Sequence, residues 1–464
     1  MSLALSSDKV DALKTFLGAE NVHSGVSVDR FDPGFNPENL DSELVITPEN
    51  ITQIQSLMKW CHQENMSIVP LGGRTGLVGG GISTLGQVTL LTTKLKKVLE
   101  INPIGQFAIV ESGVTLTALN RAAEPFGLSA GIDLGARDSC TIGGMIATNA
   151  GGMEAFRNGC MRNRVLGLEA VMADGSVFDD LTTVLKSNIG YDIKHLLIGS
   201  EGTLGIITKA VIQLEPIHTH TCTCLVSFQS ATSAIQALRH LAGPGNMSVL
   251  RCEIMWRSHF ETTARLLNFN SLVNFAQSAA IFVIFEIKID KSTDLEDVLA
   301  IILEGCASTP GFIDALALKS VREKADVWRV REDWAVDRRY PDSLWYDVSV
   351  PHEQLDTYVT ELERSLHQID KNLLIFVLGH LGDANLHVTI SSKNSTAELE
   401  SQISYCVYKP IKGSGGSFSA EHGIGVAKKK ALLTWGDPTR LKFMHTIKAI
   451  FDPYSLLNPG KIIS

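Results

Sequence analysis

Two histidines and one carboxylate, placed in two short motifs that contain glycine, are the residues of this chain best suited to bind a metal ion. His380 and His387 flank the turn of Gly379-His-Leu-Gly-Asp-Ala-Asn-Leu-His387, and Glu421 follows in Ser419-Ala-Glu-His-Gly-Ile-Gly425. Imidazoles on both sides of a short turn between strands can converge, and Glu421 would add a hard oxygen. Two histidines and one carboxylate with open positions suit Zn²⁺, Fe²⁺ or Mn²⁺. The spacing alone leaves open that these are unrelated surface or core histidines.

Three clusters of glycine and other small residues suggest a second kind of chemistry, the binding of a phosphorylated cofactor. They are Pro70-Leu-Gly-Gly-Arg-Thr-Gly-Leu-Val-Gly-Gly-Gly81, Asp138-Ser-Cys-Thr-Ile-Gly-Gly-Met-Ile-Ala-Thr-Asn-Ala-Gly-Gly152 and Gly199-Ser-Glu-Gly-Thr-Leu-Gly-Ile206. Glycine lets backbone N–H groups approach an anion closely, as in a pyrophosphate cradle, although any one cluster is equally consistent with tight turns. The spacing matches neither the GxGxxG dinucleotide fingerprint nor the phosphate-binding loop that ends in GK[ST].

A charged segment, Val321 to Arg339, is predicted to form one helix. Arg331, Ala335 and Arg338 fall at positions i, i+4 and i+7, so both guanidinium groups would share a face. A planar guanidinium suits a carboxylate, which makes Arg331 a candidate anchor for an acidic substrate. The alternative is a solvated helix whose arginines pair with nearby acidic residues.

The elements that must position these groups can be predicted from hydrophobic spacing. A helix is expected over Thr52 to Gln63, and the apolar strand Ser67 to Leu71 leads into the first glycine cluster. Asp174-Gly175, between two strand-like runs, is a strong hairpin signal. A strand is expected over Gly205 to Leu214, and Pro216 marks a boundary.

Beyond residue 217, strand-like runs alternate with helical patterns. The runs are Cys224 to Phe228, Ser248 to Met255, Ile281 to Ile289, Ala315 to Lys319, Leu344 to Val350 and Leu373 to Leu378. A final helix is expected over Thr439 to Phe451. Alternation of this kind fits either a parallel doubly wound sheet or an α+β sheet covered on one side, and periodicity does not choose between them.

The composition is that of a large folded protein. The 464 residues, of which 44% are hydrophobic and 20% charged, exclude a disordered or disulfide-stapled chain. A formal net charge of −9 disfavours nucleic acid and anionic lipid as partners. Eight scattered cysteines without a CxxC motif, no targeting signal and no apolar run long enough to span a bilayer predict a cytoplasmic protein without a transmembrane segment.

The three glycine clusters, in this order, resemble the FAD-binding domain of the vanillyl-alcohol oxidase and p-cresol methylhydroxylase family. From about Leu40 to the C-terminus, the chain is most similar to the branch of D-lactate and D-2-hydroxyglutarate dehydrogenases. The resemblance implies an α+β fold with a p-cresol methylhydroxylase-type FAD-binding domain at residues 1–216 (core about 40–216). An antiparallel-sheet substrate domain would follow at 217–420, and a C-terminal helical segment at 421–464 would return to the FAD domain.

The same resemblance assigns residues to each site. FAD would be held by Pro70, Gly72, Gly73, Arg74, Thr75, Gly76, Thr141, Gly143, Gly144, Asn149, Gly151, Gly202 and Ile207. The first cluster contains no histidine, so FAD is expected to bind non-covalently. A divalent metal, zinc or alternatively manganese or iron, would be bound by His380, His387 and Glu421. His422 matches the base that accepts the hydroxyl proton, and Asp383 or Asn385 would orient a ligand histidine or serve only in the turn.

Arg331 matches an arginine that binds substrate in this branch, but neighbouring positions depart from the pattern. The branch has a threonine where this chain has Ala335, a lysine where it has Trp345, and an asparagine where it has Thr389. These changes weaken the expected binding of a second carboxylate, and Trp345 adds an apolar wall, whereas Arg338 or Arg339 would compensate as a substitute cation. D-2-hydroxyglutarate and a monocarboxylic acid such as D-lactate therefore both remain open.

The implied function is an FAD- and metal-dependent dehydrogenase that oxidises a D-2-hydroxy acid to the 2-oxo acid, with the hydride passing to flavin N5. An accessory FAD-binding subunit of a multi-chain oxidase and a flavin-assisted transferase are the alternatives. The expected partners are the small-molecule acid and an electron acceptor such as an electron-transfer flavoprotein or a quinone. A homodimer is the family expectation.

Overall fold

The chain forms two compact units, which we describe separately. A computed structural model describes residues 6–243, 248–289, 295–393 and 396–463. The first unit comprises residues 1–152, 158–217 and 421–464, and the second comprises residues 153–157 and 218–420. Within the described ranges, no helix is both long and apolar enough to cross a membrane.

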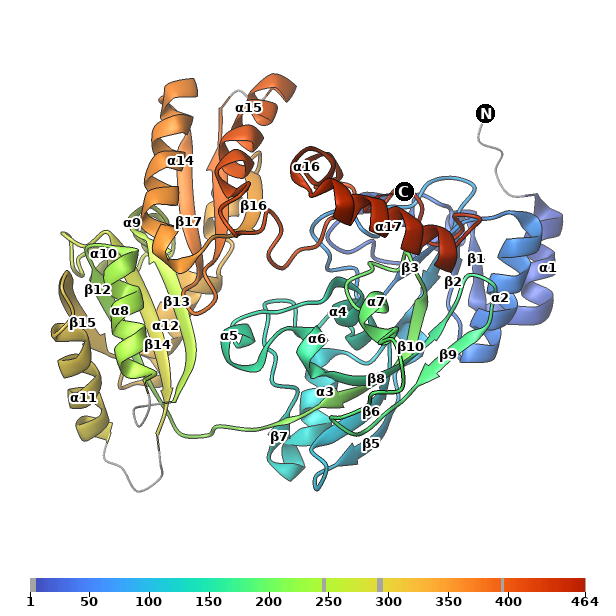
Figure 1. The fold of residues 1–464 in the computed structure, drawn as a ribbon, viewed down its shortest axis with the longest axis horizontal. Helices are drawn as coiled ribbons and strands as arrows, with labels where there is room; N and C mark the ends of the chain where they lie inside the picture. The colour runs from blue at the N-terminus through green and yellow to red at the C-terminus, as the bar shows by residue number, and fades with distance from the viewer. Residues whose placement is uncertain (1–5, 244–247, 290–294, 394–395, 464) are drawn as a thin grey trace. The chain divides into compact units, whose positions relative to one another are not determined.

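The first unit contains three sheets (Figure 1). The four-stranded sheet has the order β1 (Val22–Ser24), β2 (Leu44–Ile46), β4 (Val88–Leu91) and β3 (Ile68–Leu71). The five-stranded antiparallel sheet has the order β5 (Val98–Asn102), β6 (Phe107–Glu111), β10 (Ile206–Gln213), β8 (Val165–Val171) and β9 (Val177–Asp180). A small sheet pairs β7 (Leu128–Ser129) with β11 (Glu215–Pro216).

The local predictions for this unit are confirmed. The helix α2 (Ile51–Glu64) buries Ile54, Leu57, Met58 and Cys61, which are spaced as an amphipathic helix requires. The strands β8 and β9 form the predicted hairpin, in which the Asp174 carboxylate accepts hydrogen bonds from the N–H and hydroxyl groups of Ser176.

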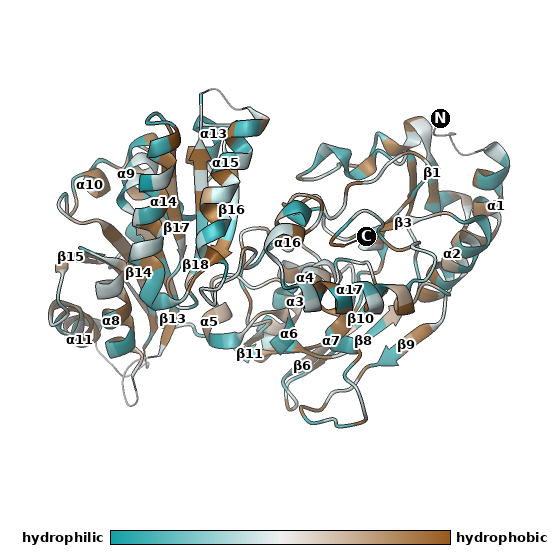
Figure 2. Ribbon diagram, turned by 45° about the horizontal axis from the view of Figure 1, so that its top comes forward, coloured by the Kyte–Doolittle hydropathy of each residue, from teal (hydrophilic) through white to brown (hydrophobic). Residues whose placement is uncertain are grey.

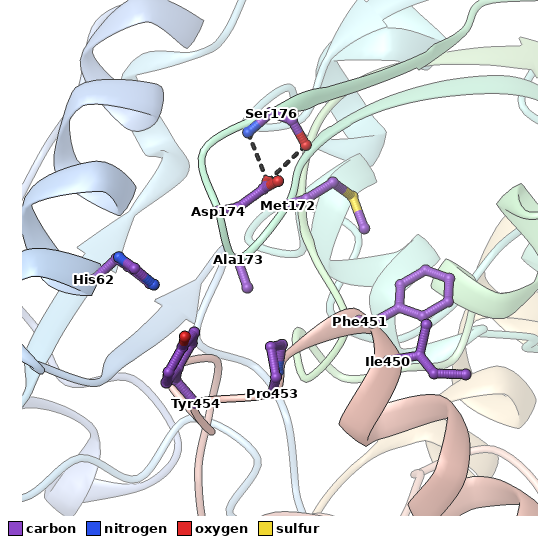
Figure 3. Close-up of a pocket in the computed structure, with 9 residues that line it drawn as sticks. All are labelled: His62, Met172, Ala173, Asp174, Ser176, Ile450, Phe451, Pro453 and Tyr454. Carbon is purple, nitrogen blue, oxygen red and sulfur yellow. Dashed lines mark hydrogen bonds between the residues drawn. The ribbon is translucent and has the colours of Figure 1, made fainter.

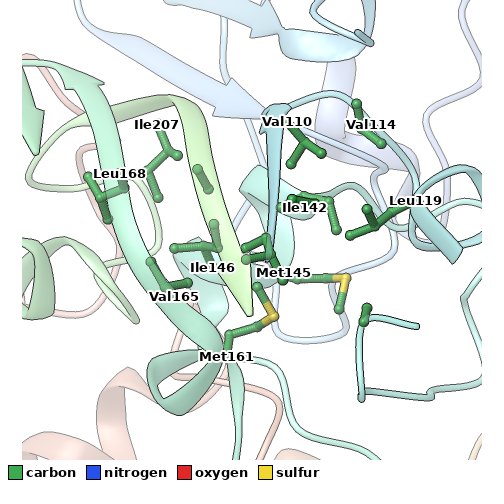
Figure 4. Packing of buried hydrophobic residues seen from close by; sticks show 14 of the residues in the cluster. Val110, Val114, Leu119, Ile142, Met145, Ile146, Met161, Val165, Leu168 and Ile207 are labelled. Carbon is green, nitrogen blue, oxygen red and sulfur yellow. The ribbon is translucent and has the colours of Figure 1, made fainter. Parts of the chain in front are cut away.

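The core of the first unit lies between the five-stranded sheet and the helix α4 (Ile142–Thr148) that the second glycine cluster forms. Ile142, Met145 and Ile146 of α4 pack with residues of β8 and β10 such as Leu168 and Ile207 (Figure 4). The remaining helices of this unit are α1 (Ser7–Leu17), α3 (Leu116–Ala123), α6 (Met161–Arg164), α7 (Lys194–Leu197), α16 (Lys429–Trp435) and α17 (Pro438–Phe451). The second glycine cluster is therefore packed against the apolar core through α4.

The second unit is built on one seven-stranded sheet whose pairs are all antiparallel. Its order is β15 (Phe312–Ala317), β12 (Thr221–Phe228), β14 (Ile281–Lys288), β13 (Val249–Trp256), β17 (Leu374–His380), β18 (Asn385–Ser391) and β16 (Leu344–Ser349). The α+β expectation is therefore confirmed, and the parallel alternative is wrong.

Helices cover this sheet and bury its apolar side chains. They are α8 (Ala231–Leu241), α9 (Arg257–Leu266), α10 (Asn270–Val273), α11 (Leu295–Ala307), α14 (Leu355–Ile369) and α15 (Ala397–Tyr408). Residues 155–157 of the short helix α5 (Ala155–Asn158) also belong to the second unit. The helix α14 buries Leu355, Val359, Leu362 and Leu366 on one side, and Figure 2 shows both hydropathy colours on it. Such two-sided helices are typical of elements that cover a sheet.

The predicted helix from Val321 to Arg339 is wrong as a single element. The structure has α12 (Val321–Glu332) and α13 (Ala335–Arg339), separated by Asp333 in an extended conformation. Both helices bury apolar residues, among them Val330 of α12 and Val336 of α13. In one continuous helix these two side chains would point about 120° apart, so the break allows both to reach the core. Arg331 and Arg338 consequently do not share a helix face.

Candidate functional site

The three glycine clusters meet within the first unit because their backbones approach closely. A Cβ atom on Gly73 would lie 2.0 Å from the carbonyl oxygen of Ser139, which belongs to the second cluster. Gly202 of the third cluster has φ of +71°, and a Cβ there would lie 2.5 Å from the ring of Pro70. Only glycine fits at such approaches, so the first cluster contacts both of the others.

The loop that follows β3 has the features of an anion-binding loop. The N–H groups of residues 73–76 donate no hydrogen bond to any residue that the structure describes. Arg74 has a left-handed φ of 58°, and its Nε is buried without a hydrogen-bond partner among the described residues. A Cβ on Gly76 would meet nothing within 4 Å. Backbone N–H groups and a guanidinium that lack protein acceptors fit the pyrophosphate of FAD.

The start of the second cluster, Ser139 to Thr141, lies beside this loop and leads into α4. The Thr141 hydroxyl caps α4 by accepting the N–H of Gly144, and a Cβ on Gly72 would lie 2.2 Å from the same hydroxyl oxygen. Asn149 ends α4 in a left-handed conformation and accepts the N–H of Arg162 through Oδ1. Of the other predicted FAD residues, Thr75 and Gly151 lie on these loops, Gly143 on α4 and Ile207 on β10.

The segment that carries Glu421 and His422 is hydrogen-bonded to the glycine clusters of the first unit. Oε1 of Glu421 accepts the N–H of Gly152 at 2.7 Å. The buried Glu201 carboxylate, in the third cluster, accepts the N–H groups of Ile424 and Gly425 at 2.7 and 2.8 Å. Burial raises the pKa of Glu201, and these two donors oppose the shift. His422 therefore lies in a short segment held from both ends.

The predicted histidine pair lies in the second unit, at the turn between β17 and β18. His380 is opposite Asn385 in the register, and His387 follows two residues later, so both imidazoles point to the same face of the sheet. Their Nε2 atoms are 3.3 Å apart and their rings are nearly perpendicular, at 86°. Two nitrogens about 2.0–2.1 Å from one tetrahedral metal ion would be about 3.3 Å apart, so the spacing fits a shared cation.

Buried carboxylates stand behind both histidines. Nδ1 of His380 is 2.8 Å from Oε1 of Glu253, and Nδ1 of His387 is 3.8 Å from Oδ1 of Asp347. Both carboxylates are 0% exposed. A carboxylate at Nδ1 favours a proton on that nitrogen and leaves the lone pair on Nε2, as in metal-binding histidines. The 3.3 Å between the two Nε2 atoms fits a hydrogen bond between the rings or, with both lone pairs turned inward, a shared cation.

Glu253 and Asp347 were not predicted from the sequence. Asp383 or Asn385 was expected to orient a ligand histidine, but the Asn385 amide instead donates to Oδ1 of Asp347 at 2.8 Å. The available signal was a single carboxylate inside each apolar strand, in Leu-Arg-Cys-Glu-Ile-Met-Trp256 and Leu-Trp-Tyr-Asp-Val-Ser349. A charge in such a strand is buried and must have partners.

Arg331 is brought to the histidine pair, whereas Arg338 and Trp345 are placed differently. The Arg331 side chain is 10% exposed, and its Nη2 forms an ion pair of 2.7 Å with Oε2 of Glu253. Arg338 is 63% exposed and bonded to Asp333 at the break between α12 and α13. The expected common face of the two arginines is therefore wrong, because the helix ends between them. Trp345, half-exposed on β16, is opposite Thr389 in the register.

A separate hollow of about 340 Å³ lies on the first unit (Figure 3). It is lined by His62, Met172, Ala173, Asp174, Ser176, Ile450, Phe451, Pro453 and Tyr454. Its carboxylate, Asp174, is bonded to Ser176 as part of the hairpin turn. None of its lining residues belongs to the predicted sites.

Comparisons with known proteins agree with this architecture. A family model described as an FAD binding domain matches residues 42–180, and one described as the C-terminal domain of FAD linked oxidases matches residues 217–462. The mitochondrial D-2-hydroxyglutarate dehydrogenase of Rattus norvegicus is 31% identical over 423 residues, covering 91% of this chain and 78% of the relative. The D-2-hydroxyglutarate dehydrogenase of Xanthomonas citri pv. viticola is 31% identical over 426 residues, covering 90% and 88%.

Solved structures show the same fold at low identity. p-Cresol methylhydroxylase with substrate bound aligns with a TM-score of 0.75 and 16% identity, covering 98% of this chain and 96% of that one. Alkyldihydroxyacetonephosphate synthase aligns with a TM-score of 0.73 and 17% identity, covering 99% and 86%. Fold and glycine loops together define a flavoprotein of the p-cresol methylhydroxylase type. The chain belongs to the family of FAD-linked oxidases and is an FAD-dependent oxidoreductase.

Proposed function

We propose that this protein is an FAD- and divalent-metal-dependent dehydrogenase that oxidises a D-2-hydroxy acid to the 2-oxo acid. The observation that carries the proposal is the pair of histidines whose Nε2 atoms are 3.3 Å apart, each backed by a buried carboxylate, with Arg331 beside them. A cation site next to a guanidinium suits a substrate that carries an oxygen ligand and a carboxylate together. Relatives named D-2-hydroxyglutarate dehydrogenase support this substrate class.

The metal would be held by His380 and His387, with Glu421 as the third ligand. The N–H of Ala420 donates to Oδ2 of Asp347 at 3.0 Å, and Glu421 is the next residue of the chain. This connection supports the proposed gathering of the three ligands. Two nitrogens and one carboxylate favour zinc, with manganese or iron as alternatives.

Arg331 and His422 would act on the substrate. The Arg331 guanidinium would bind the 2-hydroxy acid through its carboxylate, and its Nε is buried without a partner among the described residues. His422, held by the hydrogen bonds of Glu421 and of Ile424, would accept the hydroxyl proton. Bound FAD supplies the two-electron oxidation, and a bound divalent cation lowers the pKa of an attached hydroxyl.

A monocarboxylic acid such as D-lactate is the second candidate substrate beside D-2-hydroxyglutarate. Arg338, the cation expected to replace the missing lysine, is bonded to Asp333, and Arg339 lies over the ring of Tyr340 at 5.3 Å. Both arginines therefore already have partners of their own. The half-exposed Trp345 favours an apolar substituent at this end of the sheet.

Anaerobic bleaching of the flavin absorption tests the proposal. The FAD-loaded protein is mixed with each enantiomer of lactate, 2-hydroxyglutarate and malate, before and after treatment with a chelator. We expect bleaching by one or more D-acids, loss of bleaching after chelation, and recovery with zinc or manganese. Failure of every acid to bleach the flavin would contradict the dehydrogenase and favour an accessory subunit or a flavin-assisted transferase. The acceptor, an electron-transfer flavoprotein or a quinone in our proposal, is then identified by reoxidation of the bleached protein.

A further inference from the structure

The Glu253 carboxylate contacts two side chains that come from different elements of the second unit. It lies in the middle of β13, between Cys252 and Ile254, and is 0% exposed. Its Oε1 is 2.8 Å from Nδ1 of His380 on β17, and its Oε2 is 2.7 Å from Nη2 of Arg331 on α12. One buried side chain thus contacts a proposed metal ligand and the proposed substrate anchor at once.

A side chain of this kind is not explained by the stability of the sheet. The residues around it in β13, which include Cys252, Ile254 and Met255, are buried and apolar. A buried ion pair is weak support for stability, because the cost of removing charges from water offsets most of the attraction. A hydrophobic residue at position 253 would complete the apolar strand at least as well. The carboxylate therefore points to a role in the site.

We propose that Glu253 is a positioning residue that prepares both the cation site and the carboxylate site; the inference rests on the proposed function. Toward His380, it fixes the tautomer with the proton on Nδ1, so that Nε2 presents its lone pair toward Nε2 of His387. Toward Arg331, it holds Nη2 and leaves Nε, which is buried and lacks a partner among the described residues, for the substrate. A single side chain thereby fixes the distance between the proposed cation site and the proposed carboxylate site.

Substitution with glutamine makes this dual role visible. A glutamine side chain is neutral and has one oxygen and one NH₂ donor, so it cannot both accept from Nδ1 of His380 and hold Arg331 as an ion pair. If the oxygen faces His380, the NH₂ group opposes Arg331. If the NH₂ group faces His380, it donates to Nδ1 and forces the proton onto Nε2, the nitrogen needed by the metal. Either orientation of E253Q damages one of the two sites.

Metal binding and substrate binding are measured separately to test the inference. The FAD-loaded wild type and E253Q are stripped of metal and titrated with Zn²⁺ by calorimetry, and KM and kcat are measured for the preferred acid. We expect E253Q to lose about 10- to 100-fold in zinc affinity, or to raise KM by a similar factor, with FAD content unchanged. E253D, one methylene shorter, should retain at most one of the two properties.

The matched control is Glu286→Gln on the neighbouring strand β14. Glu286 is a partly buried carboxylate of the same sheet, paired with Arg251 at 3.4 Å, and within the described residues no hydrogen bond or ion pair joins it to either histidine. E286Q should keep wild-type zinc affinity and KM. Equal losses in E286Q and E253Q would show general damage to the sheet and would overturn the proposal.

Arg331→Met removes the partner of Glu253 in the carboxylate site and leaves its contact with His380. This variant is measured in place of E253Q if E253Q does not fold. In R331M, Glu253 still holds His380, so KM should rise while zinc affinity does not fall. Wild-type zinc affinity and KM in E253Q at an unchanged melting temperature would overturn the positioning role, as would loss of zinc in R331M. The zinc titration does not depend on turnover, so it decides the role of Glu253 even if no acid bleaches the flavin.

Discussion

The indole Nε1 of Trp345 donates a hydrogen bond of 2.7 Å to Oδ1 of Asp337 and so links β16 to α13. Trp334 lies edge-on to the same indole, with ring centroids 6.2 Å apart. In the register of the sheet, Trp345 precedes Asp347 by two residues, so the two side chains point to the same face. Burial raises the pKa of Asp337, which the indole N–H opposes. Trp345, which contacts Trp334 and the Asp337 carboxylate, therefore lies on the same strand as Asp347, the carboxylate behind His387.

The first prediction concerns this end of the sheet and the choice of substrate. A lysine at position 345 alone would pair with Asp337, so the informative variant is W345K combined with D337N. We expect the ratio of kcat/KM for D-2-hydroxyglutarate over D-lactate to rise about tenfold or more, which corresponds to about 1.4 kcal/mol. W345F, which keeps an apolar ring, is the control and should not raise the ratio. An unchanged ratio of the two kcat/KM values in the double variant would show that position 345 does not influence the choice of substrate.

The second prediction concerns the histidine pair. His380→Ala and His387→Ala should each reduce turnover by at least about 10²-fold, because either change removes a proposed metal ligand. FAD content should stay at the wild-type level, since the glycine loops belong to the other unit. Metal content, flavin absorbance and kcat are the measurements. His367→Ala, an exposed histidine on α14, is the control, and full activity of H380A or H387A would argue against the metal role.

The third prediction concerns Arg331. Because its guanidinium is nearly buried and paired with Glu253, R331K should raise KM for the acid by about 10- to 100-fold. A lysine keeps the charge but loses the planar pair of donors. Arg322→Lys on the same helix is the matched control, since Arg322 is 92% exposed and pairs only loosely with Asp326, at 3.8 Å. Equal KM values for R331K and R322K would be incompatible with the anchor role.

The fourth prediction uses the first glycine cluster. Gly73→Ala should lower both the melting temperature and FAD content, because its Cβ would lie 2.0 Å from the Ser139 carbonyl oxygen. Gly76→Ala places its Cβ in open space, so the melting temperature of the apoprotein should stay unchanged while FAD affinity falls. Flavin fluorescence titration and thermal unfolding distinguish the two effects. Unaltered FAD affinity in both variants would contradict the proposal that this loop binds the pyrophosphate of FAD.

The fifth prediction concerns the pH dependence of stability. Burial, followed by the positive charge of Arg331, lowers the pKa of His259 from 6.5 to about 4, while its hydrogen bond with the Val330 carbonyl opposes the shift. The unfolded chain therefore binds this proton more readily, and stability is lost as pH falls from above 6.5 toward 4. Between pH 7.5 and 5 the wild type should lose on the order of 2 kcal/mol more than His259→Gln.

Chemical denaturation at several pH values measures this difference. His367→Gln provides the comparison, because that side chain is exposed on α14. The wild type and H367Q should show the same fall in the denaturation midpoint on acidification, and H259Q a smaller fall. If the denaturation midpoints of the wild type, H367Q and H259Q fell equally on acidification, the lowered pKa of His259 would be contradicted.

Local signals were sufficient to predict much of this protein from its sequence. The amphipathic spacing of Ile54, Leu57, Met58 and Cys61 specified α2, and Asp174-Gly175 specified the hairpin between β8 and β9. The three glycine clusters suggested a phosphorylated cofactor, and their resemblance to a known family of flavoproteins implied FAD. The two histidines with Glu421 suggested a metal site. These features depend on short stretches of chain, in which period and turn chemistry dominate.

Other features depended on contacts between distant segments, and only the tertiary structure decided them. Glu253 lies 127 residues before His380 in the chain, and Arg331 lies on a separate helix. No periodic pattern in the sequence indicates either contact. The break at Asp333 allows both Val330 and Val336 to be buried, although one continuous helix would point them about 120° apart, and this burial overrides the helical propensity of the charged segment. A buried charge needs partners and an apolar face needs cover, but which segments supply them is settled only when the strands take their places in the sheet.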